Sequence, residues 1–317
     1  MAEPLHATFF AFRKREPGGV LMGASAAFAV LLILLLIVFG VGNLLLTGQD
    51  PSALMSALNT AETDPEALQS VFTPGSIVGL ALSTLVFVFL LCVLAASYEA
   101  ACLRWMIRGE RKGLFGLALD ADTWRVYGVY WVWLVFCVIG AILFMIFMAI
   151  VGAALGAAFG PDSPVMLALP VLFFAVPIIA AVRLAPAAAT CVAEQRFVFF
   201  DAWTVSSGRF WALLGAFLLI WLIYVVFSIA LSVGMFVALL GVDGFVTLVQ
   251  SASNPTELQL AINQKELEFM SGAAWPIYWG VQIVSMIAGL LYALTLFGVN
   301  ARAARAALDE GKIEQDA

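Results

Sequence analysis

Residues 126–159 read VYGVYWVWLVFCVIGAILFMIFMAIVGAALGAAF and contain no charged side chain. A helix needs about 20 consecutive apolar residues to cross the hydrocarbon core of a bilayer. This run exceeds that length, so it predicts a membrane-spanning helix that is tilted or continues beyond the hydrocarbon.

Five further apolar runs of similar length surround it, at residues 20–46, 75–103, 165–193, 211–242 and 274–300. Of the 317 residues, 63% are apolar and 11% are charged, with a mean hydropathy of +1.04. A soluble globular domain carries about 25% charged residues, so that class is excluded. We predict an all-α integral membrane protein with six transmembrane helices, arranged as three related hairpins with short interfacial helices.

The basic residues indicate how the chain is oriented. Cytoplasmic loops of membrane proteins carry an excess of Lys and Arg, and here the basic residues gather at both ends and in the second and fourth connections. The opposite face carries acids and one lysine, Lys265. We therefore expect a bacterial inner-membrane protein with both termini cytoplasmic and an uncleaved first helix. The net charge of −6 belongs mainly to the outer face, and nothing indicates a nucleic-acid partner.

Each pair of spans follows a stretch that mixes aromatic and basic residues: HATFFAFRKREPGG, RWMIRGERKGLFGLALDADTWRVY and EQRFVFFDAWTVSSGRFW. We expect each stretch to include a short amphipathic helix in the interface. The predicted divisions are 1–104 with an outer cap at about 47–74, 105–193, 194–305 with an outer cap at about 243–273, and a cytoplasmic tail at 306–317.

Both predicted caps contain a helix start, because Asp64-Pro65 and Asn254-Pro255 each place a good N-cap before a proline. Apolar positions that follow give each helix one apolar face, able to pack on the bundle or on a partner. These positions include Leu68, Phe72, Leu258 and Ile262.

Glycines at intervals of four line one helix face in two places, which lets a neighbouring backbone approach closely. These candidate helix-packing residues are Gly152, Gly156, Gly160, Gly75 and Gly79. They serve either packing within the chain or a homodimer. The four cysteines lie in or beside the spans without CxxC spacing, and His6 is the sole histidine. We expect no metal and no cofactor.

Glu99 and Arg183 are the acid and base placed deepest in apolar sequence. Charges inside a bilayer are costly and often functional. Either Arg183 extends to the headgroups and Glu99 neutralises it or meets water, or both join Asn300 in a polar patch that binds an anionic or zwitterionic ligand. These three are the candidate ligand-binding residues.

Residues 199–215, FFDAWTVSSGRFWALLG, combine an acid, two serines and an arginine between two spans. No histidine or lysine lies nearby as a base, and no GxSxG or SxxK pattern is present. An interfacial helix followed by a turn back into the membrane accounts for the stretch, so we predict no catalytic residues.

The run from Val182 to Leu219 resembles a segment of certain bacterial multi-span proteins. They include the membrane domain of some glycerophosphoryl diester phosphodiesterases and the YciC-like inner-membrane proteins. Beside Arg183, Leu184 and Ala202, the matching positions form an interfacial motif: Glu194, Trp203, Gly208, Arg209, Phe210 and Trp211. The resemblance implies a related fold and supplies no catalytic residues.

The functional expectation is a non-enzymatic accessory, scaffold or assembly component of a membrane complex. Its expected partners are membrane lipids and either another membrane protein or a second copy of the chain. A transporter or lipid-handling protein that uses the Glu99, Arg183 and Asn300 patch is the alternative. An enzyme is least favoured, because acids and bases in catalytic spacing are missing from the spans.

Overall fold

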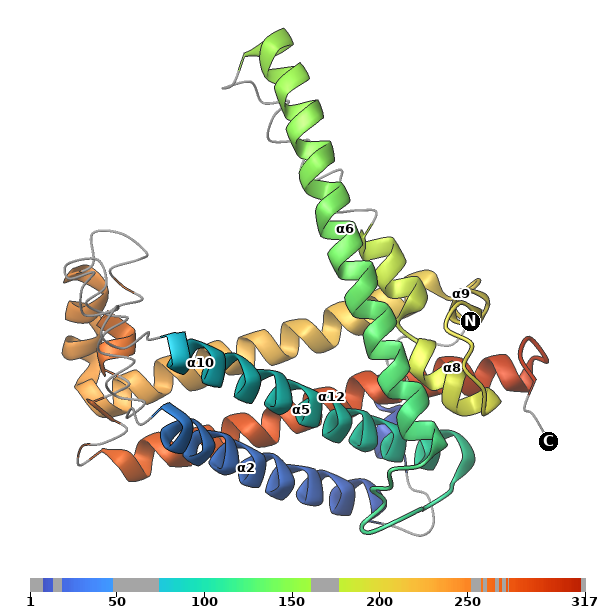
Figure 1. The fold of residues 1–317 in the computed structure, drawn as a ribbon, viewed down its shortest axis with the longest axis horizontal. Helices are drawn as coiled ribbons and strands as arrows, with labels where there is room; N and C mark the ends of the chain where they lie inside the picture. The colour runs from blue at the N-terminus through green and yellow to red at the C-terminus, as the bar shows by residue number, and fades with distance from the viewer. Residues whose placement is uncertain are drawn as a thin grey trace. The chain divides into compact units, whose positions relative to one another are not determined.

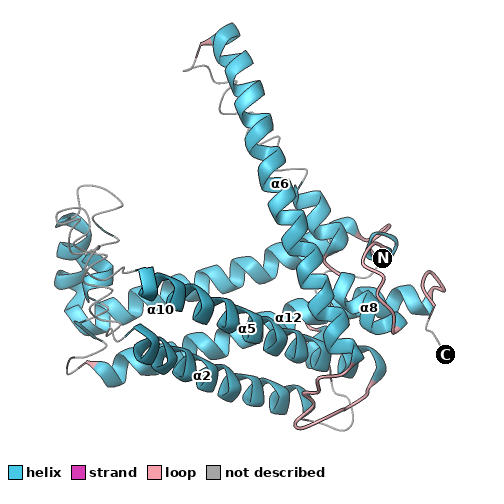
Figure 2. Cartoon of the chain, viewed as in Figure 1, coloured by secondary structure: helices cyan, strands magenta, loops and turns pink. Residues whose placement is uncertain are grey.

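The computed structural model describes residues 8–13, 19–47, 74–160, 177–251, 258, 261–265, 268–269, 272 and 274–314. These ranges are helices and loops (Figures 1 and 2), and six of the helices are long and apolar enough to cross a membrane. The prediction of an all-α membrane protein is confirmed. The elements are η1 (Phe10–Phe12), α2 (Val20–Thr47), α5 (Pro74–Arg108), α6 (Ala121–Phe159), α8 (Ala187–Glu194), α9 (Asp201–Val205), α10 (Phe210–Ser251) and α12 (Trp275–Asp309).

Several helices are longer than a bilayer requires. α5 has 35 residues, which at 1.5 Å per residue is about 50 Å, whereas the hydrocarbon core is about 30 Å thick. Its residues 77–90 include many exposed apolar side chains, but residues 96–106 are all buried. The excess length therefore packs inside protein, which agrees with the expected helical extensions.

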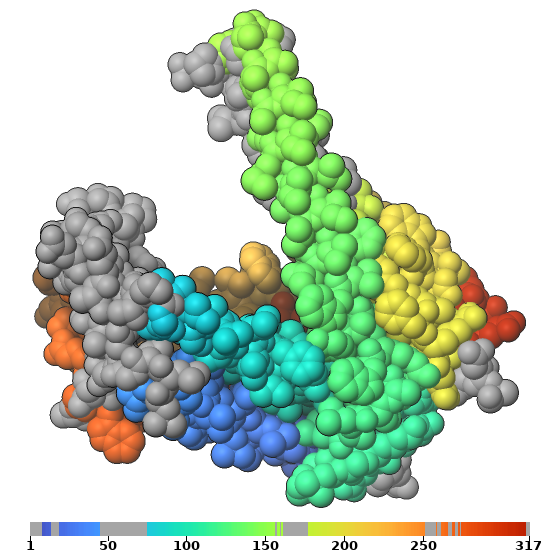
Figure 3. Space-filling view, viewed as in Figure 1, coloured from blue at the N-terminus to red at the C-terminus, as the bar shows by residue number. Residues whose placement is uncertain are grey.

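α6 shows the same division along its length. Val126 and Val129 near its start are buried, but from 134 to 150 every residue except Phe144 and Met148 is exposed. Figure 3 shows this part of α6 as a long uncovered surface. A helix that is apolar on all sides is suited to lipid or to other membrane helices.

The fourth predicted span, 165–193, is divided rather than continuous. Residues 177–184 are helical, a turn occupies 185–186, and α8 begins after Pro186. All eight residues of α8 are buried, so this helix belongs to a protein core. Proline lacks the backbone N–H and restricts the preceding residue, which explains the break. Residues 165–176 lie outside the described part of the chain.

The chain forms two compact units that cut across the predicted hairpins. Unit 1 comprises residues 1–33, 88–217 and 295–317, and unit 2 comprises 34–87 and 218–294. The core of unit 1 contains three alanine-rich stretches, from α5, α8 and α12. Their small side chains allow helices to approach closely.

The amino-terminal stretch packs against α12 in unit 1. Phe10 and Ala11 are buried, and a Cβ added to Gly298 would lie 2.9 Å from both Cβ and N of Ala11. Of the first predicted interfacial helix, the described positions 8–13 include one α-helical residue, Thr8, and the three-residue η1.

Unit 2 contains the described part of the second cap. α10 extends past its predicted end to Ser251, with a non-helical residue at Gly241, and residues 261–265 are helical. Ile262 packs against a buried cluster of Met235, Phe236, Phe269 and Tyr278. The apolar face at Ile262 therefore packs on its own chain. The start of this cap helix at Asn254-Pro255, and the first cap up to residue 73, lie outside the described residues.

The glycine prediction requires one correction. Gly160 follows the end of α6 with φ +84°, so it ends the helix and does not line its face. A Cβ added to Gly75 or Gly160 meets no atom within 4 Å. Packing through Gly79, Gly152 and Gly156 stays a prediction.

Candidate functional site

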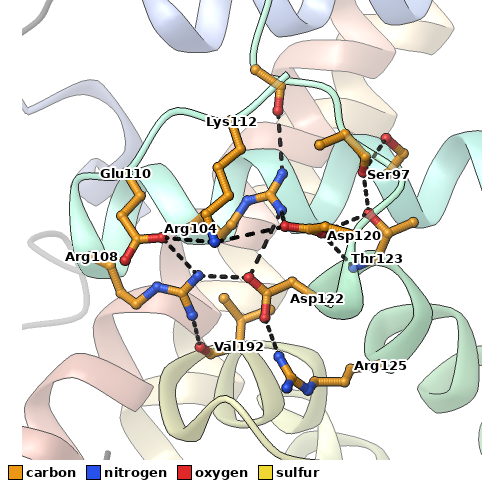
Figure 4. A network of polar contacts seen from close by, with 12 residues as sticks. Ser97, Arg104, Arg108, Glu110, Lys112, Asp120, Asp122, Thr123, Arg125 and Val192 are labelled. Carbon is orange, nitrogen blue, oxygen red and sulfur yellow. Dashed lines mark hydrogen bonds and ion pairs between the residues drawn. The ribbon is translucent and has the colours of Figure 1, made fainter. Parts of the chain in front are cut away.

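The middle interfacial stretch holds the most extensive polar network in the described part of the chain. The prediction of a short interfacial helix there is wrong. α5 continues to Arg108, α6 begins at Ala121, and residues 109–120 form a non-helical loop. The Arg104 side chain is fully buried and bonds the Asp120 carboxylate and, at 3.3 Å, the backbone oxygen of Gly116 (Figure 4). Arg104 thus joins the end of α5 to the loop.

Asp122 bridges the elements around this loop. Its carboxylate accepts from Arg108 Nη2 at 2.6 Å and from Arg125 Nη1 at 2.6 Å, and lies 3.8 Å from Arg104 Nη1. Only 4% of the Asp122 side chain is exposed. Arg108 also donates to the Val192 backbone oxygen at 2.5 Å, which ties α5 to α8. The Asp122 carboxylate therefore lies within ion-pair distance of three arginines, of which Arg104 also pairs with Asp120 and Arg108 with Glu110.

Asp120 also caps the amino end of α6. Its Oδ1 accepts from the Thr123 backbone N–H at 3.2 Å, the arrangement of a side-chain N-cap. Thr123 Oγ1 donates to the Ala118 backbone oxygen at 2.5 Å, and Ser97 Oγ approaches the same oxygen at 3.4 Å. These bonds hold the second half of the loop against α5 and α6.

The loop requires backbone conformations that favour glycine. Gly109, Gly113 and Gly116 have φ of +71°, +72° and +95°, and Phe115, a residue with a large side chain, has φ +54°. A Cβ on Gly113 would lie 1.9 Å from the Leu117 backbone oxygen. Left-handed backbone at a bulky residue is strained and persists only where the surroundings impose it.

Three apolar side chains of this loop are exposed although the backbone is held in place. Leu114 is 77% exposed, Phe115 52% and Leu119 68%; we call these three residues the loop patch. The loop rests on the start of α2: a Cβ on Gly116 would lie 3.6 Å from Val20, and one on Gly23 would lie 3.9 Å from Phe115.

The charge network changes the pKa of Asp120. Burial acts to raise it, but the positive charge of Arg104 and the Thr123 backbone N–H act in the opposite direction. The net effect holds the pKa of Asp120 below its ordinary value of 3.8. A carboxyl with a lowered pKa in the folded chain stabilises the fold when it is ionised.

We expect Asp120→Asn to alter the acid stability of the protein. Ionised Asp120 stabilises the folded state above its unfolded pKa of about 4, and that contribution is lost as the pH falls below this value. The variant should therefore melt below wild type at pH 7, and the two melting temperatures should converge between pH 4 and pH 2. Thermal unfolding in detergent across this range tests it, with Asp309→Asn as the control. A constant difference at every pH would contradict the assignment.

The three residues of the predicted ligand patch lie in separate environments. Tyr130 Oη donates to Glu99 at 2.6 Å. Arg183 donates to the Ser206 backbone oxygen at 3.2 Å. Asn300 Oδ1 is buried without a hydrogen-bond partner. In the described ranges no hydrogen bond or ion pair joins the three, so the Glu99 and Arg183 pair allowed by the sequence is not formed.

The interfacial motif folds into the α8–α10 connection. Glu194 is fully buried and accepts from Arg196 Nε at 2.8 Å. α9, only five residues long, is the part of the third predicted interfacial helix that forms. Gly208 has φ +77° at the turn, and Arg209 bonds Glu310 of the carboxyl-terminal tail. No family model, curated protein or solved structure matches the chain.

Sequence reasoning missed the network at the α5–α6 loop. The arginines there were interpreted only as markers of orientation, because basic residues in a short loop are expected on the cytoplasmic face. The available signal was the presence of three acids, Glu110, Asp120 and Asp122, in the same stretch. Acids interleaved with arginines beside buried helix ends predict internal ion pairs.

Proposed function

We propose that the chain is a non-enzymatic accessory component of a membrane protein complex and that it binds a partner protein through the loop patch. The supporting observation is an exposed apolar loop held by a buried ion network. Exposed apolar patches mark interaction surfaces. A rigid loop also loses little conformational entropy when a partner binds.

The construction of the loop supports a binding role over a simple connection. Burying Arg104 removes a charge from water, which costs several kcal/mol before pairing compensates it. Phe115 adds backbone strain, yet its side chain stays half exposed. A plain link between two helices needs neither feature. Presentation of Leu114, Phe115 and Leu119 in a fixed geometry accounts for both.

Polar residues in the helices favour this role over transport. Ser83 Oγ donates to Asn43 Oδ1 at 2.5 Å, and Ser25 Oγ lies 2.8 Å from Tyr98 Oη. Together with the bond from Tyr130 to Glu99, these contacts join α2 to α5 and α5 to α6. Such pairs fasten helices to one another, whereas a transport path needs polar groups facing a shared cavity.

We further propose that the protein lies in a bacterial inner membrane with both termini cytoplasmic. Several contacts of unit 1 support placing the termini on one side. Ala11 lies against Gly298 of α12, and Glu310 in the tail bonds Arg209. The loop from 109 to 120 and the α8–α10 connection belong to the same unit. The loop carries Arg111 and Lys112, and the connection carries Arg196 and Arg209.

The test compares proteins extracted from native membranes in lipid nanodiscs. We expect wild type to carry a stoichiometric protein companion, which mass spectrometry identifies. In the variant Leu114→Ser with Leu119→Ser, bound companion should fall at least about tenfold, because burying one leucine contributes about 1.5–3 kcal/mol. The matched variant Leu114→Met with Leu119→Met should keep it. An unchanged companion in the serine variant, or none in wild type, would overturn the proposal.

A further inference from the structure

Arg183 contacts residues that do not belong to the loop patch. Its guanidinium carbon is 5.4 Å from the centre of the Trp203 ring and 5.5 Å from that of Phe210. Nη1 donates to the Ser206 backbone oxygen. Two rings and one carbonyl therefore fix the guanidinium in place.

Arg183 has no carboxylate partner among the residues the structure describes. Arg104, Arg108, Arg125, Arg196 and Arg209 each bond an Asp or Glu. Cation–π contacts attract a cation without neutralising it. Arg183 is only half buried. Apart from the bond to Ser206, its guanidinium N–H groups are not among the polar atoms that are buried without a hydrogen-bond partner. An anion from outside the protein can therefore reach them.

The surroundings of Arg183 have the character of a membrane surface. The helix that carries it ends at residue 184, and α10 begins at Phe210. Trp203 is 48% exposed and Trp211 is 78% exposed. Exposed tryptophans at the ends of membrane helices typically lie at headgroup depth. Phospholipid phosphates occupy the same depth.

We infer that Arg183 binds the phosphate group of an anionic membrane phospholipid, with Trp203 and Trp211 beside the headgroup. The planar guanidinium forms paired hydrogen bonds to phosphate oxygens. The two rings and the Ser206 carbonyl hold that plane before the lipid arrives, which reduces the entropy lost on binding. This site is separate from the loop patch and does not depend on the proposed protein partner.

The probe is phosphatidylglycerol, added to the delipidated full-length protein in detergent and counted by native mass spectrometry. We expect one phosphatidylglycerol to remain bound to wild type under conditions that strip phosphatidylethanolamine. Arg183→Gln should reduce the retained lipid about tenfold, since a charge-assisted pair is lost. Arg183→Lys should retain an intermediate amount, because ammonium keeps the charge without the paired geometry.

A control variant and a second test variant accompany Arg183→Gln. Arg305→Gln removes an exposed arginine of α12 and should leave retention unchanged. If Arg183→Gln fails to fold, Trp203→Leu keeps the arginine, removes one supporting ring and should still weaken retention severalfold. The inference would be overturned if Arg183→Gln or Trp203→Leu retained as much phosphatidylglycerol as wild type. Displacement of the lipid by millimolar inorganic phosphate would also overturn it, because the site would then take a free anion.

Discussion

Asp122→Ala is expected to destabilise unit 1 by about 3–5 kcal/mol, the usual effect of removing one partner from a buried charge pair. Asp122 bonds Arg108 and Arg125 directly and lies close to buried Arg104. Without its carboxylate, Arg108, only 5% exposed, loses its bond to the start of α6. Thermal unfolding of the full chain in detergent measures the effect.

Glu110→Ala is the matched control for Asp122→Ala. Glu110 also bonds Arg108, at 3.1 Å, but 38% of its side chain is exposed, and exposed ion pairs contribute about 0–1 kcal/mol. We expect the Glu110 variant to unfold near the wild-type temperature. Equal effects from the two substitutions would mean that burial does not decide the strength of this network.

Gly113→Ala is expected to disrupt the loop while leaving the helices intact. The added Cβ would lie 1.9 Å from the Leu117 backbone oxygen, and φ at this position is +72°. Backbone must move to relieve such a contact, so the Leu114–Leu117 bridge is lost. Hydrogen exchange of residues 109–120 should increase strongly, and the nanodisc companion should be lost as it is with the serine variant.

Gly109→Ala is the control that distinguishes the strain of a left-handed backbone from the steric clash with the Leu117 backbone oxygen. Gly109 has nearly the same φ, +71°, but an added Cβ meets no atom within 4 Å. Left-handed backbone alone costs about 1–2 kcal/mol for a residue with a side chain. We expect this variant to keep a protected loop and to retain the companion. If it exchanged as rapidly as Gly113→Ala, the collision with Leu117 would not explain the effect.

The sequence predicted the membrane class and the spans because long apolar runs require no knowledge of tertiary contacts. The uninterrupted run at 126–159 is one helix in the structure. Helix ends were less predictable. α5 continues five residues past its predicted end at residue 103, because its end packs inside unit 1 rather than stopping at a membrane surface.

The candidate site was less accessible to sequence reasoning. The short interfacial helix predicted within residues 104–127 did not form as a separate element, because Gly109, Gly113 and Gly116 all take positive φ, which no α-helix allows. The bond from Arg104 to Asp120 spans 16 residues and forms only when this loop closes. Arg183 was selected from the sequence as a candidate ligand-binding residue, but its contacts with Trp203 and Phe210 depend on how the chain folds back after α8.

Site-specific photo-crosslinking from the loop patch tests the central claim most directly. A benzoylphenylalanine replaces Leu114 in the full chain, and cells that naturally contain the protein are irradiated with their membranes intact. We expect one discrete protein adduct at position 114 and none from the same group at exposed position 309. Adducts with lipid alone at position 114, or the same protein adducts at both positions, would contradict it.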